Sequence, residues 1–318
     1  MNKQKYSKTF ILFILVWAQF ILFNFVDAQE DTSAINTEQV ANRAFVFPHE
    51  TGRIFATPTA EVLKSLDLNL ILGGSFGFEE NTSFLGNVAF GLGNFADIEI
   101  NTSSLIGTLA LSSSNISTIA LKGRIINGNA KLPSVAIGLR ASNDWDKNKL
   151  NESGVRTASP DLFREGLRGL DYEARMTTAF TVASKEVNDN LCLHGGLGIT
   201  DLRYRNAQTV IWIEPGYRTY QQVGVKRKNL VSVFGGIVYT INDRTQFMIE
   251  VQNMPYFDVN LKDGSLVPRQ RGLAVGGVRF AISKTLLLDT GIRYQSNFKG
   301  LADAQIRLSL SFFFPIKT

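Results

Sequence analysis

Residues 304–314 read Ala-Gln-Ile-Arg-Leu-Ser-Leu-Ser-Phe-Phe-Phe. A β-strand points successive side chains to opposite faces, so Ile306, Leu308 and Leu310 share one face, and Arg307 and Ser309 share the other. In a soluble sheet, such an apolar face meets a hydrophobic core. In an outer-membrane barrel, it meets lipid while the polar face lines a wet lumen.

The same alternation recurs along the chain and predicts about twelve strands, within a range of about ten to fourteen. Most of them are close to the ~9–11 residues with which a tilted strand crosses a bilayer. We expect the strands at residues 66–78, 83–93, 95–104, 115–126, 132–142, 172–185, 191–204, 229–241, 245–254, 271–282, 285–295 and 303–314.

The connections between these strands alternate in length. Short turns rich in Asn, Asp and Gly, such as Asn127-Gly128-Asn129 and Asn242-Asp243-Arg244, follow every second strand. Longer connections, notably 143–171 and 205–228, come between them. This pattern is typical of outer-membrane barrels, whose short turns are periplasmic and whose long loops are outside. We therefore expect an all-β fold: a single antiparallel up-and-down transmembrane β-barrel.

The alternative to this fold is a soluble β-sandwich. A sandwich also has regularly spaced turns, but its hairpins need not alternate in length, and secreted sandwiches often carry disulfides. Cys192 is the only cysteine, so the chain has no disulfide framework of its own.

One segment departs from the strand pattern. Ser159-Pro160-Asp161 is a helix-start signal, so we expect a short helix over 155–168, in the longest outer loop.

The N-terminus resembles a secretion signal. Three lysines precede the apolar run from Phe10 to Val26, and a small residue, Ala28, ends a plausible cleavage site. An uncleaved membrane anchor is the alternative. The predicted organisation is a signal peptide at 1–28, a periplasmic lead-in at 29–65 and an outer-membrane barrel at 66–318.

Charge argues against nucleic acid as a partner. The whole chain carries +5 and residues 1–28 carry three Lys and one Asp, a net of +2, which leaves +3 for the mature chain. So small an excess does not indicate a polyanion-binding protein.

Four stretches resemble the YjbH-like family of bacterial outer-membrane barrels, which are associated with exopolysaccharide production. They are Thr57-Pro58-Thr59-Ala60-Glu61-Val62-Leu63, the Gly-rich run from Ala89 to Asp97, Phe180-Thr181-Val182-Ala183-Ser184-Lys185 and Leu193-His194-Gly195-Gly196-Leu197-Gly198. The resemblance implies an outer-membrane location and a role in surface polysaccharide. It implies no catalytic site.

The sequence predicts no catalytic, cofactor-binding or metal-binding residues. The two histidines, His49 and His194, and Cys192 are well separated and make a poor metal set. A lipolytic barrel would need a serine close to His194, and the neighbouring sequence offers none, although another strand could supply one. We expect His194 to face the lumen as a hydrogen-bonded structural residue.

Charged side chains on the polar faces of the strands form the main candidate set. A charge toward lipid costs ~2–4 kcal/mol at the midplane for Arg or Lys, so these groups are expected to line the lumen. They either border a narrow aqueous path or pair and plug it, and we expect the plug. The predicted lumen-lining residues are Lys122, Arg124, Arg140, Glu173, Arg175, Glu250, Asp289, Arg293 and Arg307.

The outer connection 205–228 contains Trp212, Tyr217 and Tyr220, which are possible sugar contacts. The alternative is an aromatic girdle at the membrane interface.

Taken together, these features favour a non-enzymatic barrel of the bacterial outer membrane that supports polysaccharide export or envelope organisation. A narrow porin-like channel is the second hypothesis and a lipid-modifying enzyme a distant third. Expected partners are outer-membrane lipids, lipopolysaccharide and the barrel-assembly machinery, with polysaccharide or export proteins as further candidates.

Overall fold

The computed structural model describes residues 51–76, 83–101, 118–143, 145–148, 167–213, 216–260, 262–296 and 304–315. Their regular structure consists of β-strands alone. The strands are β1 (Asp67–Phe76), β2 (Ser83–Leu92), β3 (Ala96–Asn101), β4 (Thr118–Ile126), β5 (Ser134–Ser142), β6 (Trp145–Asn148), β7 (Leu167–Asn188), β8 (Leu191–Ile213), β9 (Gly216–Asn242), β10 (Thr245–Val259), β11 (Leu266–Ser283), β12 (Leu286–Gln295) and β13 (Gln305–Pro315).

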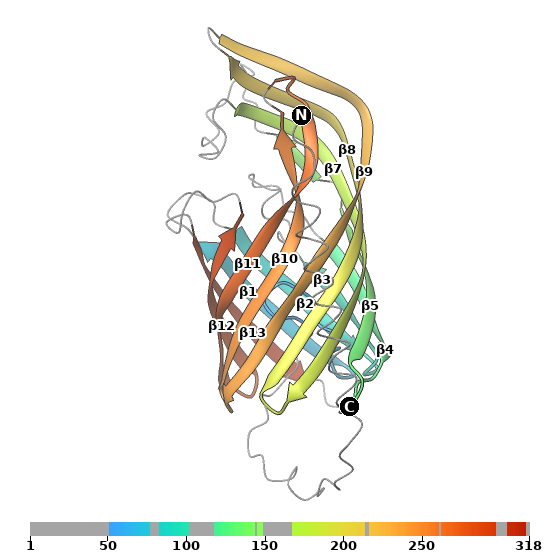
Figure 1. Ribbon diagram of the computed structural model, residues 1–318, viewed down its shortest axis with the longest axis vertical. Helices are drawn as coiled ribbons and strands as arrows, with labels where there is room; N and C mark the ends of the chain where they lie inside the picture. The colour runs from blue at the N-terminus through green and yellow to red at the C-terminus, as the bar shows by residue number, and fades with distance from the viewer. Residues whose placement is uncertain are drawn as a thin grey trace, which may run out of the picture. The chain divides into compact units, whose positions relative to one another are not determined.

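Twelve of these strands close into a barrel (Figure 1). Each pairs antiparallel with its neighbours along the chain, the first strand pairs with the last, and β5 pairs directly with β7. The short strand β6 pairs with β7 outside this ring. The predicted closed twelve-strand antiparallel barrel is confirmed.

The two described residues of the helix expected over 155–168 are not helical. Residues 155–166 lie outside the described part of the chain, and residues 167–168 belong to β7. Among the described residues, no helix has the length and apolar character needed to cross a membrane.

The alternation of β13 appears in the structure as two distinct faces. Ile306, Leu308 and Phe314 are exposed on the outer surface, whereas Arg307 and Ser309 are buried inside. The same outward apolar face continues on other strands, through Leu121, Ile137, Leu139, Leu197, Ile199, Val231, Ile237, Ile249 and Ile292. A continuous apolar band around a closed sheet is stable against lipid and not against water, so the barrel has the surface of a transmembrane protein.

Strand β7 departs from the predicted orientation. Its apolar residues Met176, Phe180 and Val182 are buried inside the barrel, and Thr181 on the alternate face is exposed outside. The prediction that the apolar face of this strand meets lipid is therefore wrong. The reason is that this part of the lumen is apolar: Phe180 and Val182 pack against Ala60, from the segment that precedes the barrel.

The connection predicted at 205–228 is a long β-hairpin and not a loop. Strands β8 and β9 stay in register to the pair Ile213 and Gly216, with one irregularity between Arg205 and Ala207. Asn206, at this bulge, has a positive φ of 54°. Figure 1 shows β8 and β9 rising beyond the other strands and bending over. In the 143–171 connection, residues 145–148 form β6 and residues 167–171 begin β7.

Strands β10 and β11 separate from β9 as they leave the barrel wall. The last pair between β9 and β10 joins Phe234 to Gln252, shortly before Pro255. Proline has no N–H to donate to a neighbouring strand, so it favours the point at which a strand becomes an edge. Beyond it, the buried positions of β10 switch from even numbers, such as Met254, to odd numbers, such as Phe257.

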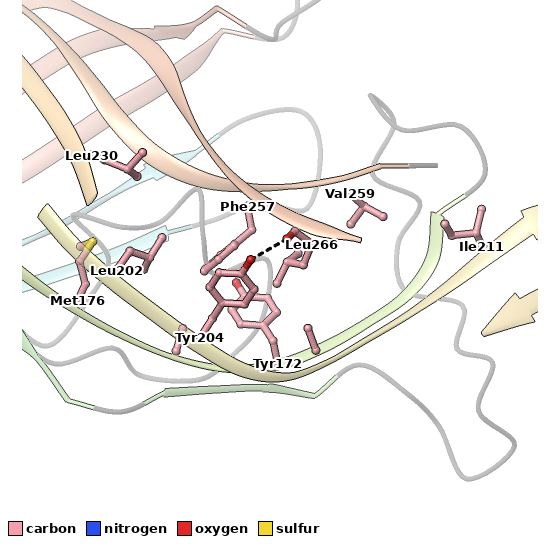
Figure 2. Packing of buried hydrophobic residues seen from close by; sticks show 11 residues of the cluster. Tyr172, Met176, Leu202, Tyr204, Ile211, Leu230, Phe257, Val259 and Leu266 are labelled. Carbon is pink, nitrogen blue, oxygen red and sulfur yellow. Dashed lines mark hydrogen bonds between the residues drawn. The ribbon is translucent and has the colours of Figure 1, made fainter. Parts of the chain in front are cut away.

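That switch shows where the β10–β11 hairpin lies. Phe257 and Leu266 pack on the inward face of β7 and β8, against Tyr172 and Tyr204 (Figure 2). The ring centroid of Phe257 is 4.5 Å from that of Tyr172 and 5.3 Å from that of Tyr204. The hairpin therefore lies on the inner side of the extended β7–β9 sheet.

Polar contacts fix the same hairpin in place. The hydroxyl of Tyr204 donates to the carbonyl oxygen of Leu266 at 3.0 Å, and Thr209 Oγ1 donates to the carbonyl oxygen of Gly264 at 2.6 Å. Gly264 has a φ of +66°, and a Cβ there would lie 2.2 Å from the ring of Tyr220. Only glycine combines this conformation with so close an approach.

Candidate functional site: the charged lumen

Residues 51–66, which we call the plug segment, lie against the lumen face of the strands. Ile54 and Phe55 are buried among Met248 and Val275 of β10 and β11, and Leu63 packs in a second cluster. We expected residues 29–65 to be a periplasmic lead-in, and the described part of that lead-in, 51–65, is instead inside the barrel. Residues 1–50 lie outside the described chain.

Glu250 on β10 holds the plug segment by its backbone. One carboxylate oxygen, Oε2, accepts hydrogen bonds from the N–H groups of Phe55, Ala56 and Thr57 at 3.0, 2.9 and 3.1 Å. The hydroxyl of Thr57 donates to the same oxygen at 3.0 Å. Successive backbone N–H groups form a concave site for an anion, and here the barrel wall supplies the anion. The side chain of Glu250 is fully buried.

Arg279 and Asp289 form the second attachment. Their buried pair joins Nε to Oδ1 at 2.7 Å and Nη2 to Oδ2 at 2.9 Å. The remaining donors of Arg279 reach the plug segment, at Thr51 Oγ1 (2.8 Å) and at the carbonyl oxygen of Ile54 (2.7 Å). Arg307 on β13 adds a bond to the carbonyl oxygen of Phe55 at 2.9 Å.

The opposite wall holds the plug segment through β3 and β4. Lys122 pairs with Asp97 at 3.2 Å and donates to the carbonyl oxygen of Gly52 at 3.1 Å, and it also donates to that of Glu61. Arg124 pairs with the carboxylate of Glu61 at 2.9 Å. These contacts connect the plug segment to strands on both sides of the lumen.

A third ionic group surrounds Glu99 on β3. Arg53 of the plug segment forms an ion pair with Glu99, and Arg140 on β5 lies 3.8 Å from the same carboxylate. Arg293 on β12 is buried and donates a long bond, 3.4 Å, to Gln305.

Seven of the nine predicted lumen charges therefore point inward: Lys122, Arg124, Arg140, Glu250, Asp289, Arg293 and Arg307. The other two do not. Glu173 and Arg175 lie on the outward face of β7, alternate to the buried Tyr172, Ala174 and Met176. Their predicted place in the lumen is wrong for the same reason as the orientation of β7.

Sequence reasoning missed five charges of the site: Arg53, Glu61, Asp97, Glu99 and Arg279. Arg279 carried a usable signal, because it alternates with the outward Phe280 and Ile282 on one strand. Arg53 carried none, since it lies outside every strand. The contacts between these charges and the plug segment join distant parts of the chain, and no local pattern reveals them.

A serine–histidine pair exists across two neighbouring strands. Ser184 Oγ on β7 is 2.8 Å from Nδ1 of His194 on β8, and it accepts a hydrogen bond from the N–H of Ala60 at 2.8 Å. Both side chains are buried. The pair faces the lumen beneath the plug segment and not the lipid, where a lipid-modifying enzyme would need it. Its visible role is to hold Ala60.

The predicted sugar contacts have different surroundings. Tyr220 packs against the apolar cluster of Figure 2 and beneath Gly264, so the fold already employs its ring. The backbone positions of Trp212 and Tyr217 are partners in the register of β8 and β9. Among the described residues, no group of three or more His, Cys, Asp or Glu side chains is placed to hold a metal ion.

Comparison with known proteins yields distant structural likenesses. No family model matches the chain, and no curated protein matches it. A NanC porin structure shares 13% identity at a TM-score of 0.43, covering 77% of this chain and 98% of the porin. The translocator domain of the autotransporter NalP from Neisseria meningitidis shares 12% at 0.46, covering 79% and 89%. The CymD monoaromatic hydrocarbon channel shares 10% at 0.40, covering 79% and 88%. The barrel assignment rests on the strand pairing itself.

Proposed function

We propose that this chain is a non-enzymatic barrel of the bacterial outer membrane whose lumen is held closed by its own plug segment. The observation that carries the proposal is the binding of three consecutive backbone N–H groups by the buried carboxylate of Glu250. A buried carboxylate is costly without hydrogen bonds, and all four that Oε2 accepts come from the plug segment, so this contact favours a segment that stays in place.

The outer membrane is the location that best fits this surface. The apolar outward band requires lipid, and a closed β-barrel leaves no unpaired strand edge in the ring. The predicted signal peptide and the short turns at one end agree with export and with a periplasmic position for that end.

The biological process we propose is support of surface polysaccharide or envelope organisation, as the family resemblance implies. A barrel of this size encloses little space once side chains are in place, and the plug segment occupies part of it. We therefore propose that the barrel acts as an anchor or accessory for export proteins. A polysaccharide strand passing through its lumen fits this geometry less well.

A narrow solute channel is the second candidate, and one observation favours it. Several inward polar side chains of β1, β2 and β13 have buried atoms without a hydrogen-bond partner among the described residues, namely in Asn69, Asn87 and Ser311. Buried polar groups of this kind are usually satisfied by water. A hydrated strip along this wall would become a conducting path if the plug segment moved.

Planar-bilayer recording separates the two candidates. We expect the refolded mature protein to stay closed, and a variant lacking residues 51–66 to pass a steady ion current, because that deletion removes the plug segment and keeps every strand. Steady conduction by the intact protein would contradict the closed barrel and favour the channel. A deletion variant that assembles and remains closed would show that the plug segment does not seal the lumen.

Cysteine labelling tests the orientation of the barrel. In a Cys192→Ser background, a cysteine at Val223, which is 84% exposed on the β9 extension, should react with an impermeant maleimide on intact cells. A cysteine at Asp243, in the short turn between β9 and β10, should react only after lysis. The reverse pattern would mean that the barrel is inserted with the other end outward.

A further inference from the structure

Three arginines form one row across the outer surface of the barrel. Arg175 on β7 is the register partner of Arg203 on β8, which in turn is the partner of Arg227 on β9. Directly opposite residues on neighbouring strands have Cβ atoms about 4.5–5.5 Å apart, and like charges placed this way destabilise a sheet. Such a row needs an anion to balance it.

The protein itself supplies only part of the negative charge that this row requires. Asp201 is 2.6 Å from Arg227 Nε and 3.1 Å from Arg203 Nε, so one carboxylate serves two guanidinium groups. Among the described residues, no ion pair is formed by Arg175. Three arginines against one aspartate leave a net charge of +2 on this row, with many guanidinium N–H donors still unused.

A hollow marks the same place. A depression of about 160 Å³ is lined by Arg175, Thr177, Asp201 and Arg203. Arginine presents a planar set of donors that matches a phosphate group and binds it in a bidentate manner. The hollow therefore has the donors and the charge that a phosphate would require.

The position of the row on the barrel identifies the source of the phosphate. An apolar row lies nearer the middle of the barrel on the same three strands. It consists of Ala179, Ile199 and Val231, which are aligned in register, and the last two are 61% and 57% exposed. Arg203 lies four residues beyond Ile199 on β8, which corresponds to about 10 Å along the membrane normal for a tilted strand. Headgroups begin at the end of the apolar band, within reach of an arginine side chain.

We propose that Arg175, Arg203 and Arg227 bind the phosphate of an outer-leaflet lipid headgroup, such as the phosphorylated glucosamine of lipopolysaccharide. The acyl chains would lie on the apolar rows below, beside Ile199 and Val231. This inference rests on the proposed outer-membrane orientation, and it is independent of whether the lumen is closed.

Binding of diphosphoryl lipid A in mixed micelles tests the proposal on the refolded mature protein. Replacing all three arginines by glutamine should weaken binding by about tenfold or more, because several charge-assisted bonds are lost. Arg244→Gln, a single replacement of the same kind at the opposite end of the barrel, should alter binding by less than about twofold, and each single replacement within the row should weaken binding more than it does. Equal binding by the triple variant and the wild type would overturn the proposal.

Two further measurements distinguish a lipid site from a merely solvated face. Asp201→Asn removes the carboxylate that competes for the arginines, so lipid A should bind more tightly, whereas unchanged or weaker binding would contradict the site. Inorganic phosphate should bind far more weakly than the lipid, and equal affinity would overturn the assignment to a membrane lipid. Closed or open behaviour in planar bilayers bears only on the plug segment, so the two proposals can fail separately.

Discussion

Glu250→Gln should lower the free energy of unfolding by about 2–4 kcal/mol and loosen the plug segment. The carboxylate oxygen accepts four hydrogen bonds from residues 55–57, and bonds to a charged acceptor are stronger than those to a neutral amide. The amide would also place a donor where only donors converge. Reversible urea unfolding in detergent measures the loss, and limited proteolysis at Arg53 measures the release of the segment.

Glu61→Gln is the matched control for that variant. Its carboxylate pairs with Arg124 and is 22% exposed, so solvent can compensate for much of the lost charge. We expect a loss below about 1 kcal/mol. A comparable loss from both variants would show that Glu250 is no more important than a partly solvated pair, and that the plug segment is held mainly by its apolar contacts.

Ile237→Arg should strongly impair assembly, whereas Val225→Arg should be tolerated. Both residues are apolar, exposed and on the outward face of β9. Ile237 lies within the apolar band, where an arginine costs about 2–4 kcal/mol, and Val225 lies beyond the band, where the cost is about 0–1 kcal/mol. Heat-modifiable migration of the folded barrel in outer-membrane fractions measures assembly.

The same pair of variants tests the height of the band. Equal yields from Ile237→Arg and Val225→Arg would contradict the proposal that the membrane ends between these two residues. Val231 lies on the same outward face of β9, between Ile237 and Val225. The loss of assembled barrel should therefore be smaller for Val231→Arg than for Ile237→Arg.

Alternation within single strands predicted most of the barrel. In β13, Leu308 faces outward and Arg307 inward as expected, because a period of two leaves no other arrangement when one face is apolar. The short turns also limited the register, since residues on either side of a tight turn must pair. The extension of the β8–β9 hairpin was missed because its polar residues, such as Arg205 and Lys226, resemble those of a loop.

Strand β7 shows where this reasoning fails. The rule that apolar residues face lipid holds only when the lumen is wet, and near Phe180 the lumen is filled by Ala60 and its neighbours. Both faces of β7 therefore met apolar surroundings at this height, and the sequence alone contained no means to choose between them. Glu173 and Arg175 were misplaced as a direct consequence.

The sequence by itself determined the number of barrel strands, their pairing order and the outward band on the strands other than β7, because these depend on local alternation and on short turns. Only the tertiary structure decided what fills the lumen. The anion-binding site in the plug segment consists of backbone N–H groups, which every residue except proline carries, and its acceptor, Glu250, lies 195 residues away from Phe55. A contact between a common backbone group and a distant side chain leaves no pattern in the sequence, and it appears only when the closed barrel brings the two together.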